Sequence, residues 1–362
     1  MDLLTLTNVV IFIIGIVVLI IVHELGHFLA ARLLNVDVEE FGIGFPPRIL
    51  GTARNADGKR VWFGLQTPEN LGPKQTILSL NWIPLGGFVR PKGENDPSIQ
   101  GGLAAANPWT RLGVLFAGPA MNLLVGVILG ILWVYSLGEP VAEKVLIASI
   151  AGGSPAEVAG IQPGDIVLKV NGQQIDNISR LQGFIADNLD KQVTMVILRG
   201  DQTIVVNLTP RQNPPAGQGP LGVGLSNPTR PIGIGTATLR GTAAAFENIR
   251  AIIALPGKML SGEARPEETR LVGFKGMFDM YQYIQSPLLI FMTISMSLGF
   301  MNLLPIPALD GGRILFTMPE ILIRKRVPVK FENTVHLVGF ALLLLLLIYI
   351  NVQDFINPIQ FP

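Results

Sequence analysis

Long apolar runs constrain the fold of this chain more than any other feature of its sequence. The first run extends from Leu6 to Leu34, which is long enough as an α-helix to cross a hydrocarbon core of about 30 Å. Comparable runs occupy residues 112–137, 287–304 and 335–350. Charged residues make up only 15% of the sequence, which is too few for a wholly soluble chain. Together these runs predict four transmembrane helices.

The distribution of basic residues predicts the orientation of the chain in a membrane, because cytoplasmic loops carry an excess of lysine and arginine. Five basic residues follow the third apolar run before the fourth begins: Arg313, Arg324, Lys325, Arg326 and Lys330. No basic residue precedes Arg32, and none follows Ile350. We therefore expect a multi-pass protein of the plasma or inner membrane, with this basic loop in the cytoplasm and both termini outside.

Composition excludes several other classes of function. The chain has 27 basic and 26 acidic residues, so it lacks the net positive charge that holds nucleic acid, and no nucleic-acid partner is expected. It has no cysteine, which excludes thiolate metal ligands and thiol nucleophiles.

The segment between the first and second runs contains alternating, glycine-punctuated pieces. Residues 41–45 and 82–90 are of this kind, and they predict the strands of a small sheet or of hairpins.

The segment between the second and third runs has an ordinary globular composition over residues 141–211. Strands are expected at residues 166–170, 193–198 and 204–208, and the Asn171-Gly172 pair predicts a turn. A proline- and glycine-rich linker at residues 212–235 comes next. After it lies a short amphipathic stretch near residues 246–260, which we expect on the membrane surface.

The first apolar run contains a His-Glu-Leu-Gly-His sequence at residues 23–27. On an α-helix, His23 and His27 share one face, so both imidazoles can reach one metal ion. Zinc accepts neutral nitrogen ligands, and Glu24 is well placed to act as a general base beside it. Two histidines and a glutamate inside an apolar span are costly to bury unless they form a site. The pattern therefore predicts a zinc centre.

A third zinc ligand must come from elsewhere in the chain, and Asp310 is the best candidate. It lies at the inner end of the third run, in a stretch from Asn302 to Gly312 where prolines interrupt the helix. The charge distribution predicts that this end lies on the same side of the membrane as His23. An alternative is that Asp310 only stops a helix and that Asn302 only satisfies backbone groups freed by the prolines. His336 is expected to be an interfacial residue and not a ligand.

With these residues in view, the chain resembles the site-2 protease family of zinc intramembrane proteases. The resemblance covers nearly the whole chain, and it rests on residues 23–27, 83–88, 116–122 and 302–312. It implies that His23, His27 and Asp310 bind zinc, that Glu24 is the base, and that Asn302 positions or polarises the substrate. It also implies that residues 41–90 form a membrane-associated β element that holds a substrate in an extended form.

The globular insert resembles a PDZ domain, as in bacterial members of the family, through Gly160–Asp165 and the strand, turn and helix that follow. A PDZ domain captures chain ends by strand addition; the alternative is that this one only blocks access. The expected fold is thus a multi-pass α-helical membrane protein with four transmembrane helices, a membrane-associated β element and one α/β PDZ domain. The expected parts are 1–35, 36–108 (β element), 109–138, 139–211 (PDZ domain), 212–285, 286–313 and 314–362.

The resemblance implies regulated intramembrane proteolysis, in which an upstream site-1 type protease first trims a single-span membrane protein such as an anti-sigma factor. The alternatives are clearance of remnant signal peptides by the same residues, and a non-catalytic PDZ scaffold, which the intact Glu24 argues against. A metal transporter is a further alternative, but such proteins need several intramembrane acidic sites. The expected partners are these protein substrates, the upstream protease and membrane lipid.

Overall fold

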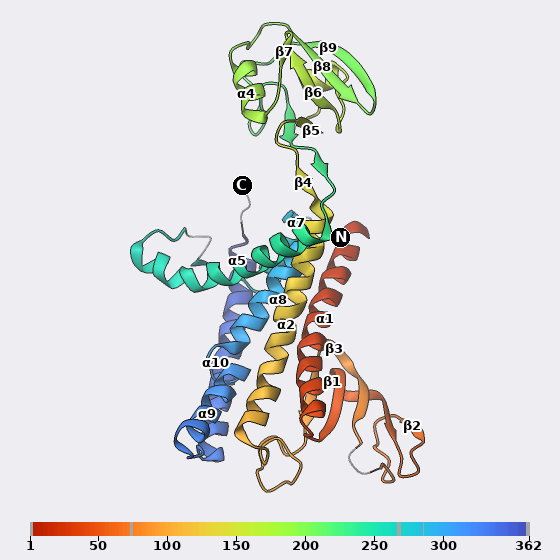
Figure 1. Cartoon of the computed structure of the whole chain (residues 1–362), viewed down its shortest axis with the longest axis vertical. Coiled ribbons are helices and arrows are strands. Elements are labelled where there is room, and N and C mark those ends of the chain that lie inside the picture. The colour runs from red at the N-terminus through yellow and green to blue at the C-terminus, as the bar shows by residue number, and fades with distance from the viewer. Residues whose placement is uncertain (1–2, 73–74, 266–268, 285, 360–362) are drawn as a thin grey trace. The chain divides into compact units, whose positions relative to one another are not determined.

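The computed structural model describes residues 3–72, 75–265, 269–284 and 286–359. The chain divides into two compact units. The first unit comprises residues 1–133 and 238–362, and the second unit comprises residues 134–237. Figure 1 labels the elements of each unit.

Three helices are long and apolar enough to cross a membrane: α1 (Leu3–Leu33), α2 (Pro108–Leu137) and α10 (Val329–Ile356). They confirm three of the four apolar runs as candidate spans. The other run forms α8 (Pro287–Leu303), which is equally apolar but has only 17 residues, short of the roughly 20 that a perpendicular span requires. It ends early because Pro305 and Pro307 interrupt the chain beyond it.

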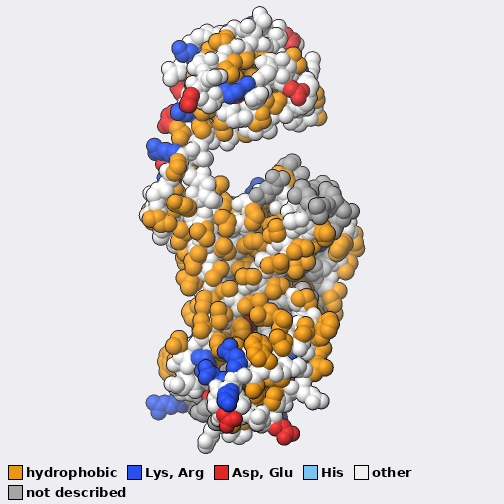
Figure 2. Space-filling view, turned by 90° about the vertical axis from the view of Figure 1, so that its right-hand side faces the viewer, with side chains coloured by type: hydrophobic (Ala, Val, Ile, Leu, Met, Phe, Trp, Pro, Cys, Tyr) orange, Lys and Arg blue, Asp and Glu red, His pale blue; other side chains and the backbone are white. Residues whose placement is uncertain are grey.

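Much of the apolar surface of the first unit is uncovered, as expected of helices that face lipid. Figure 2 shows hydrophobic side chains over much of one face of this unit, with lysine and arginine gathered toward one end. In the most apolar 18-residue stretch of α10, only 6% of the residues are buried.

The helices of the first unit approach one another closely through small residues. A Cβ atom at Gly26 of α1 would lie 2.3 Å from the Ala117 carbonyl oxygen of α2. One at Gly299 of α8 would lie 2.9 Å from the Pro119 carbonyl oxygen of α2. Glycine at these positions lets α1 and α8 both pack directly against α2, a device typical of membrane helices. Two further helices, α7 (Phe274–Ile284) and α9 (Asp310–Ile323), also pack against α8.

A small sheet follows α1. It has the strand order β2-β1-β3, with β1 at Val38–Arg54, β2 at Arg60–Phe63 and β3 at Ile77–Pro91. These strands confirm the prediction for residues 41–45 and 82–90. Phe41 in the first half of β1 lies opposite both Val89 and Leu78, so it sits between the two halves of β3. The second half of β3 is therefore at one edge of the sheet, and it contacts α1.

The second unit is built on an antiparallel sheet of order β10-β5-β6-β8-β9, with β7 paired to β6. The strands are β5 (Val145–Ile150), β6 (Ile166–Val170), β7 (Gln173–Gln174), β8 (Val193–Arg199), β9 (Gln202–Leu208) and β10 (Val223–Ser226). Two helices accompany them, α3 (Pro155–Val158) and α4 (Ile178–Ala186). The three predicted strands and the turn are confirmed, because Asn171 and Gly172 both have positive φ between β6 and β7.

The stretch after residue 211, which we expected to be a proline- and glycine-rich linker, contains regular structure. It contains β10, which extends the sheet beside β5, and β11 (Thr229–Arg230), which pairs with β4 (Glu139–Pro140). The amphipathic stretch is also longer than predicted: α5 runs over Ile234–Ser261 and continues through Pro256. Isolated apolar residues among prolines and glycines gave too weak an alternation to reveal such short strands.

Candidate metal centre

The two motif histidines lie one turn apart on α1 and face the same way, as their spacing predicts. Their Nε2 atoms are 3.2 Å apart, and both residues are buried. The His27 ring is held in place because Gly118 of α2 packs directly against it. The helix thus presents two ring nitrogens to one point.

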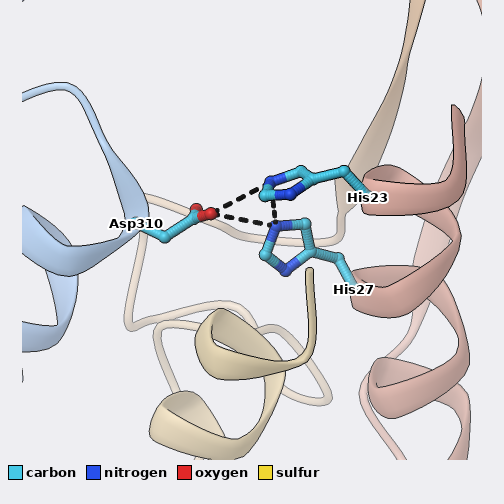
Figure 3. Close-up of side chains that lie close together, drawn as sticks. All are labelled: His23, His27 and Asp310. Atoms are coloured by element: carbon cyan, nitrogen blue, oxygen red, sulfur yellow. Dashed lines mark hydrogen bonds and ion pairs between the residues drawn. The ribbon is translucent and has the colours of Figure 1, made fainter. Parts of the chain in front are cut away.

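Asp310 reaches that point from a distant part of the chain. It is the first residue of α9, and its Oδ2 atom lies 3.1 Å from His23 Nε2 and 3.3 Å from His27 Nε2 (Figure 3). The loop before it is held by His336, whose Nδ1 accepts a 2.9 Å hydrogen bond from the backbone N–H of Ala308. Ala308 has a φ of 74°, which is unusual for a residue with a side chain. The sequence did not predict this role for His336.

The donor set fits a zinc ion. Asp310 Oδ2 is buried, and it faces the Nε2 atoms of both histidines. His27 Nδ1 donates to the Val114 carbonyl oxygen at 2.8 Å, so the lone pair of its Nε2 faces Asp310 and His23. Two imidazole nitrogens and one carboxylate oxygen leave one position open in a tetrahedral set, which is the pattern of catalytic zinc sites. These three residues could therefore hold the metal.

Glu24 is fixed beside the same point by the β element. Its Oε2 atom accepts a 3.0 Å hydrogen bond from the backbone N–H of Val89 in β3. This N–H points toward α1 and does not take part in the hydrogen bonding between β3 and β1. It therefore joins the edge of the sheet directly to the candidate base.

All five residues singled out from the sequence line one cavity of about 420 Å³: His23, Glu24, His27, Asn302 and Asp310. Asn302 comes from the last turn of α8. Gly87, Phe88 and Val89 of β3 form part of the wall. Arg313 and Glu94, which are ion-paired with each other, form another part.

The groups that surround the predicted ligands were not predicted from the sequence. Val114, Gly118 and Asn122 of α2 all contact the histidines, yet only a family resemblance drew attention to residues 116–122. The Val89 contact is made by backbone, which carries no sequence signal. The one sign in the sequence was an asparagine within an apolar run, Asn122, since polar residues in such runs are rare without a function.

Comparisons with known proteins show the family of the chain. Residues 11–346 match the profile of Peptidase family M50. A protein of Clostridium perfringens named as a zinc metalloprotease is 32% identical over 94% of this chain and 96% of its own length. One of Campylobacter jejuni with the same kind of name is 33% identical over 93% of this chain and 90% of its own length.

Among solved structures, the PDZ domain of an SdrC-like protein from Listeria monocytogenes aligns with 23% of this chain and 87% of that domain, at 17% identity and a TM-score of 0.21. The family profile covers most of the chain, and two relatives match it nearly end to end. The chain belongs to Peptidase family M50, the site-2 protease family of zinc metalloproteases.

Proposed function

We propose that this protein is a zinc-dependent endopeptidase that cuts transmembrane segments of other proteins within the membrane. The observation that carries the proposal is the convergence of His23, His27 and Asp310 from two helices, with a buried carboxylate oxygen that faces both ring nitrogens. One of those helices is a candidate membrane span. The three residues are the proposed zinc ligands, and Glu24 is the proposed general base.

Zinc bound there would act as a Lewis acid toward the peptide carbonyl and activate a water molecule for attack. Glu24 would take a proton from the attacking water with one carboxylate oxygen, while Val89 N–H holds the other. As the C–N bond breaks, Glu24 gives the proton to the departing amine, so the products are a carboxylate chain end and an amino chain end. Asn302 lines the same cavity, where its amide can orient the peptide carbonyl.

The substrate is proposed to lie extended along β3. The second half of this strand is at the edge of the sheet, and its residues Gly87, Phe88 and Val89 line the cavity. An extended chain can add to such an edge through backbone hydrogen bonds. Transmembrane substrates are helical, so unwinding near helix-breaking residues is a requirement for cleavage.

The proposed topology has four spans, with α8 as the third, and places the cavity toward the cytoplasm and the second unit outside. The basic residues between α9 and α10 support this orientation. Cysteines introduced singly at Asp176 and Lys325 are expected to react with an impermeant reagent from opposite sides. Labelling of both from one side would contradict the topology.

The second unit is proposed to be a PDZ domain that captures peptide ends. Between α4 and β10 lies a groove of about 290 Å³, lined by apolar side chains including Leu181, Ile185, Leu221 and Val223. A groove between a helix and a strand suits an added peptide strand.

Regulated proteolysis of a trimmed single-span protein, such as an anti-sigma factor, is the proposed setting, and remnant signal peptides are the alternative substrates. The test is cleavage of a model single-span substrate by the purified protein, with the cut site mapped by mass spectrometry. Wild-type protein is expected to cut inside the apolar segment, and Glu24→Gln is expected to leave the substrate intact. Cuts confined to soluble flanks would contradict intramembrane cleavage.

A further inference from the structure

His23 makes a second contact that the proposed reaction does not use. Its Nδ1 atom lies 3.3 Å from Nδ2 of Asn122, a residue of α2 that is fully buried. The other end of the same amide, Oδ1, is buried and has no hydrogen-bond partner among the described residues. A buried amide oxygen without a donor is costly. A half-turn of the amide gives a second arrangement, in which Oδ1 faces the His23 ring.

The two arrangements of the amide have opposite consequences for His23. A neutral imidazole carries its proton on one nitrogen and a lone pair on the other. With Nδ2 facing the ring, Nδ1 accepts a hydrogen bond and Nε2 carries the proton, which it can donate to Asp310 Oδ2 at 3.1 Å. With Oδ1 facing the ring after a half-turn of the amide, Nδ1 donates and the Nε2 lone pair faces Asp310. Only the second arrangement leaves Nε2 able to bind a metal.

The neighbouring histidine shows what the second arrangement achieves. His27 Nδ1 faces the Val114 carbonyl oxygen at 2.8 Å, which can only accept. His27 is therefore permanently set with its Nε2 lone pair toward the site. Both acceptor positions come from α2, eight residues apart, so one helix backs both rings.

We propose that Asn122 is a positioning residue that presents its amide oxygen to Nδ1–H of His23 and so sets the tautomer and orientation required of a zinc ligand. This inference rests on the proposed function. Hydrogen-bonded neighbours of this kind commonly change metal affinity about 10- to 100-fold when they are removed. An asparagine, unlike a backbone carbonyl, can also satisfy the metal-free ring by turning over.

The test is zinc affinity of the full-length protein in detergent, measured by competition with a chromogenic chelator. Asn122→Leu removes the hydrogen bond at similar volume, and Asn122→Asp replaces the amide by a group that only accepts from Nδ1–H. Ser295→Ala is the matched control, because it removes the 2.8 Å hydrogen bond from Ser295 to the Asn122 backbone oxygen without touching His23. The cobalt-substituted forms give a second readout, since their visible absorption reports ligand geometry.

Asn122→Leu is expected to weaken zinc binding by about 10- to 100-fold and to shift the cobalt spectrum. Asn122→Asp is expected to bind zinc at least as tightly as wild type, and Ser295→Ala is expected to match wild type. Wild-type affinity in Asn122→Leu would overturn the inference. If Asn122→Leu does not fold, Asn122→Asp decides alone, because a loss of about tenfold or more there would overturn it.

A His23→Ala variant separates this inference from the proposed function. Loss of zinc in His23→Ala without loss in Asn122→Leu would reject the role of Asn122 and leave the zinc site standing. Unchanged zinc affinity in His23→Ala would reject the site itself.

Discussion

The two units of this protein bury different kinds of residue. The second unit has one hydrophobic cluster of fifteen buried residues, among them Ile147, Leu181 and Met195, in the manner of a water-soluble domain. The first unit has only small clusters of three to five buried residues among its described residues, and it leaves long apolar side chains on its outside. Its interior instead holds His23, His27 and Asn122.

Buried polar groups also serve different ends in the two units. In the second unit they support local structure: Ser154 caps α3, and Asp165 is paired with Arg199. In the first unit the polar groups around the cavity point at one another: Asp310 Oδ2 faces the Nε2 atoms of both histidines, and the Asn122 amide faces His23. Burying polar groups costs free energy that only partners can offset. A buried carboxylate oxygen that converges with two ring nitrogens therefore indicates a bound cation more strongly than any buried polar group of the second unit does.

We expect the largest effect from a glycine-to-alanine substitution beside the candidate metal centre. The same substitution in the second unit is the comparison. A Cβ atom at Gly118 would lie 2.2 Å from His27 Nε2, whereas one at Gly183 in α4 meets nothing within 4 Å. Gly118→Ala must displace the His27 ring, and we expect cleavage to fall about 100-fold. Gly183→Ala is expected to leave cleavage unchanged and to stabilise α4 by about 0.5–1 kcal/mol. Wild-type cleavage by Gly118→Ala would show that the ring has more freedom than the packing suggests.

The outer surfaces provide the next contrast. Leu345 in α10 and Val205 in β9 are similarly exposed, at 63% and 61%. Leu345→Asp places a charge in a candidate span and is expected to cost about 3 kcal/mol of membrane insertion. Val205→Asp faces water and is expected to cost about 1 kcal/mol or less. The alkali-resistant membrane fraction and thermal unfolding measure these effects. Equal membrane fractions for both variants would remove the distinction between the surfaces.

Acidification is expected to weaken the second unit through its buried carboxylate. Burial acts to raise the pKa of Asp165, but hydrogen bonds from Arg199 and from the Gln162 amide outweigh it and hold the pKa below its ordinary value. A lowered folded-state pKa means that the stabilisation is complete above the unfolded pKa of about 3.9. It is lost as pH falls from there through the folded-state pKa.

We expect Asp165→Asn to destabilise the second unit by about 1–3 kcal/mol near neutral pH and to flatten its loss of stability below about pH 4. Hydrogen exchange of residues 134–237 in the full chain measures both. Asp176→Asn is a suitable control, because both side chains of the Asp176–Arg180 ion pair are exposed. An unchanged acid response in Asp165→Asn would assign that response to other groups.

Elements that depend on local periodicity could be predicted from the sequence, whereas contacts that depend on packing could not. Apolar runs predicted α1, α2 and α10, and the five-residue motif predicted that His23 and His27 share a face. Asp310 could be proposed as a ligand because it is an acidic residue beside a helix that prolines interrupt. The Val89 amide and the Val114 carbonyl could not be predicted, since backbone groups are alike in every residue. Short strands such as β10 were missed because their pairing with β5 depends on contacts distant in sequence.

In the proposed centre, His23, His27 and Asp310 hold zinc while Glu24 acts as the base. The most direct test is the zinc content of purified wild type, Glu24→Gln and Asp310→Ala after dialysis against a chelator, together with cleavage of one model substrate. Wild type and Glu24→Gln are expected to keep about one zinc per chain, with cleavage by Glu24→Gln at background. Asp310→Ala is expected to lose both zinc and activity. Zinc held by Asp310→Ala as firmly as by wild type, or normal cleavage by Glu24→Gln, would contradict the account.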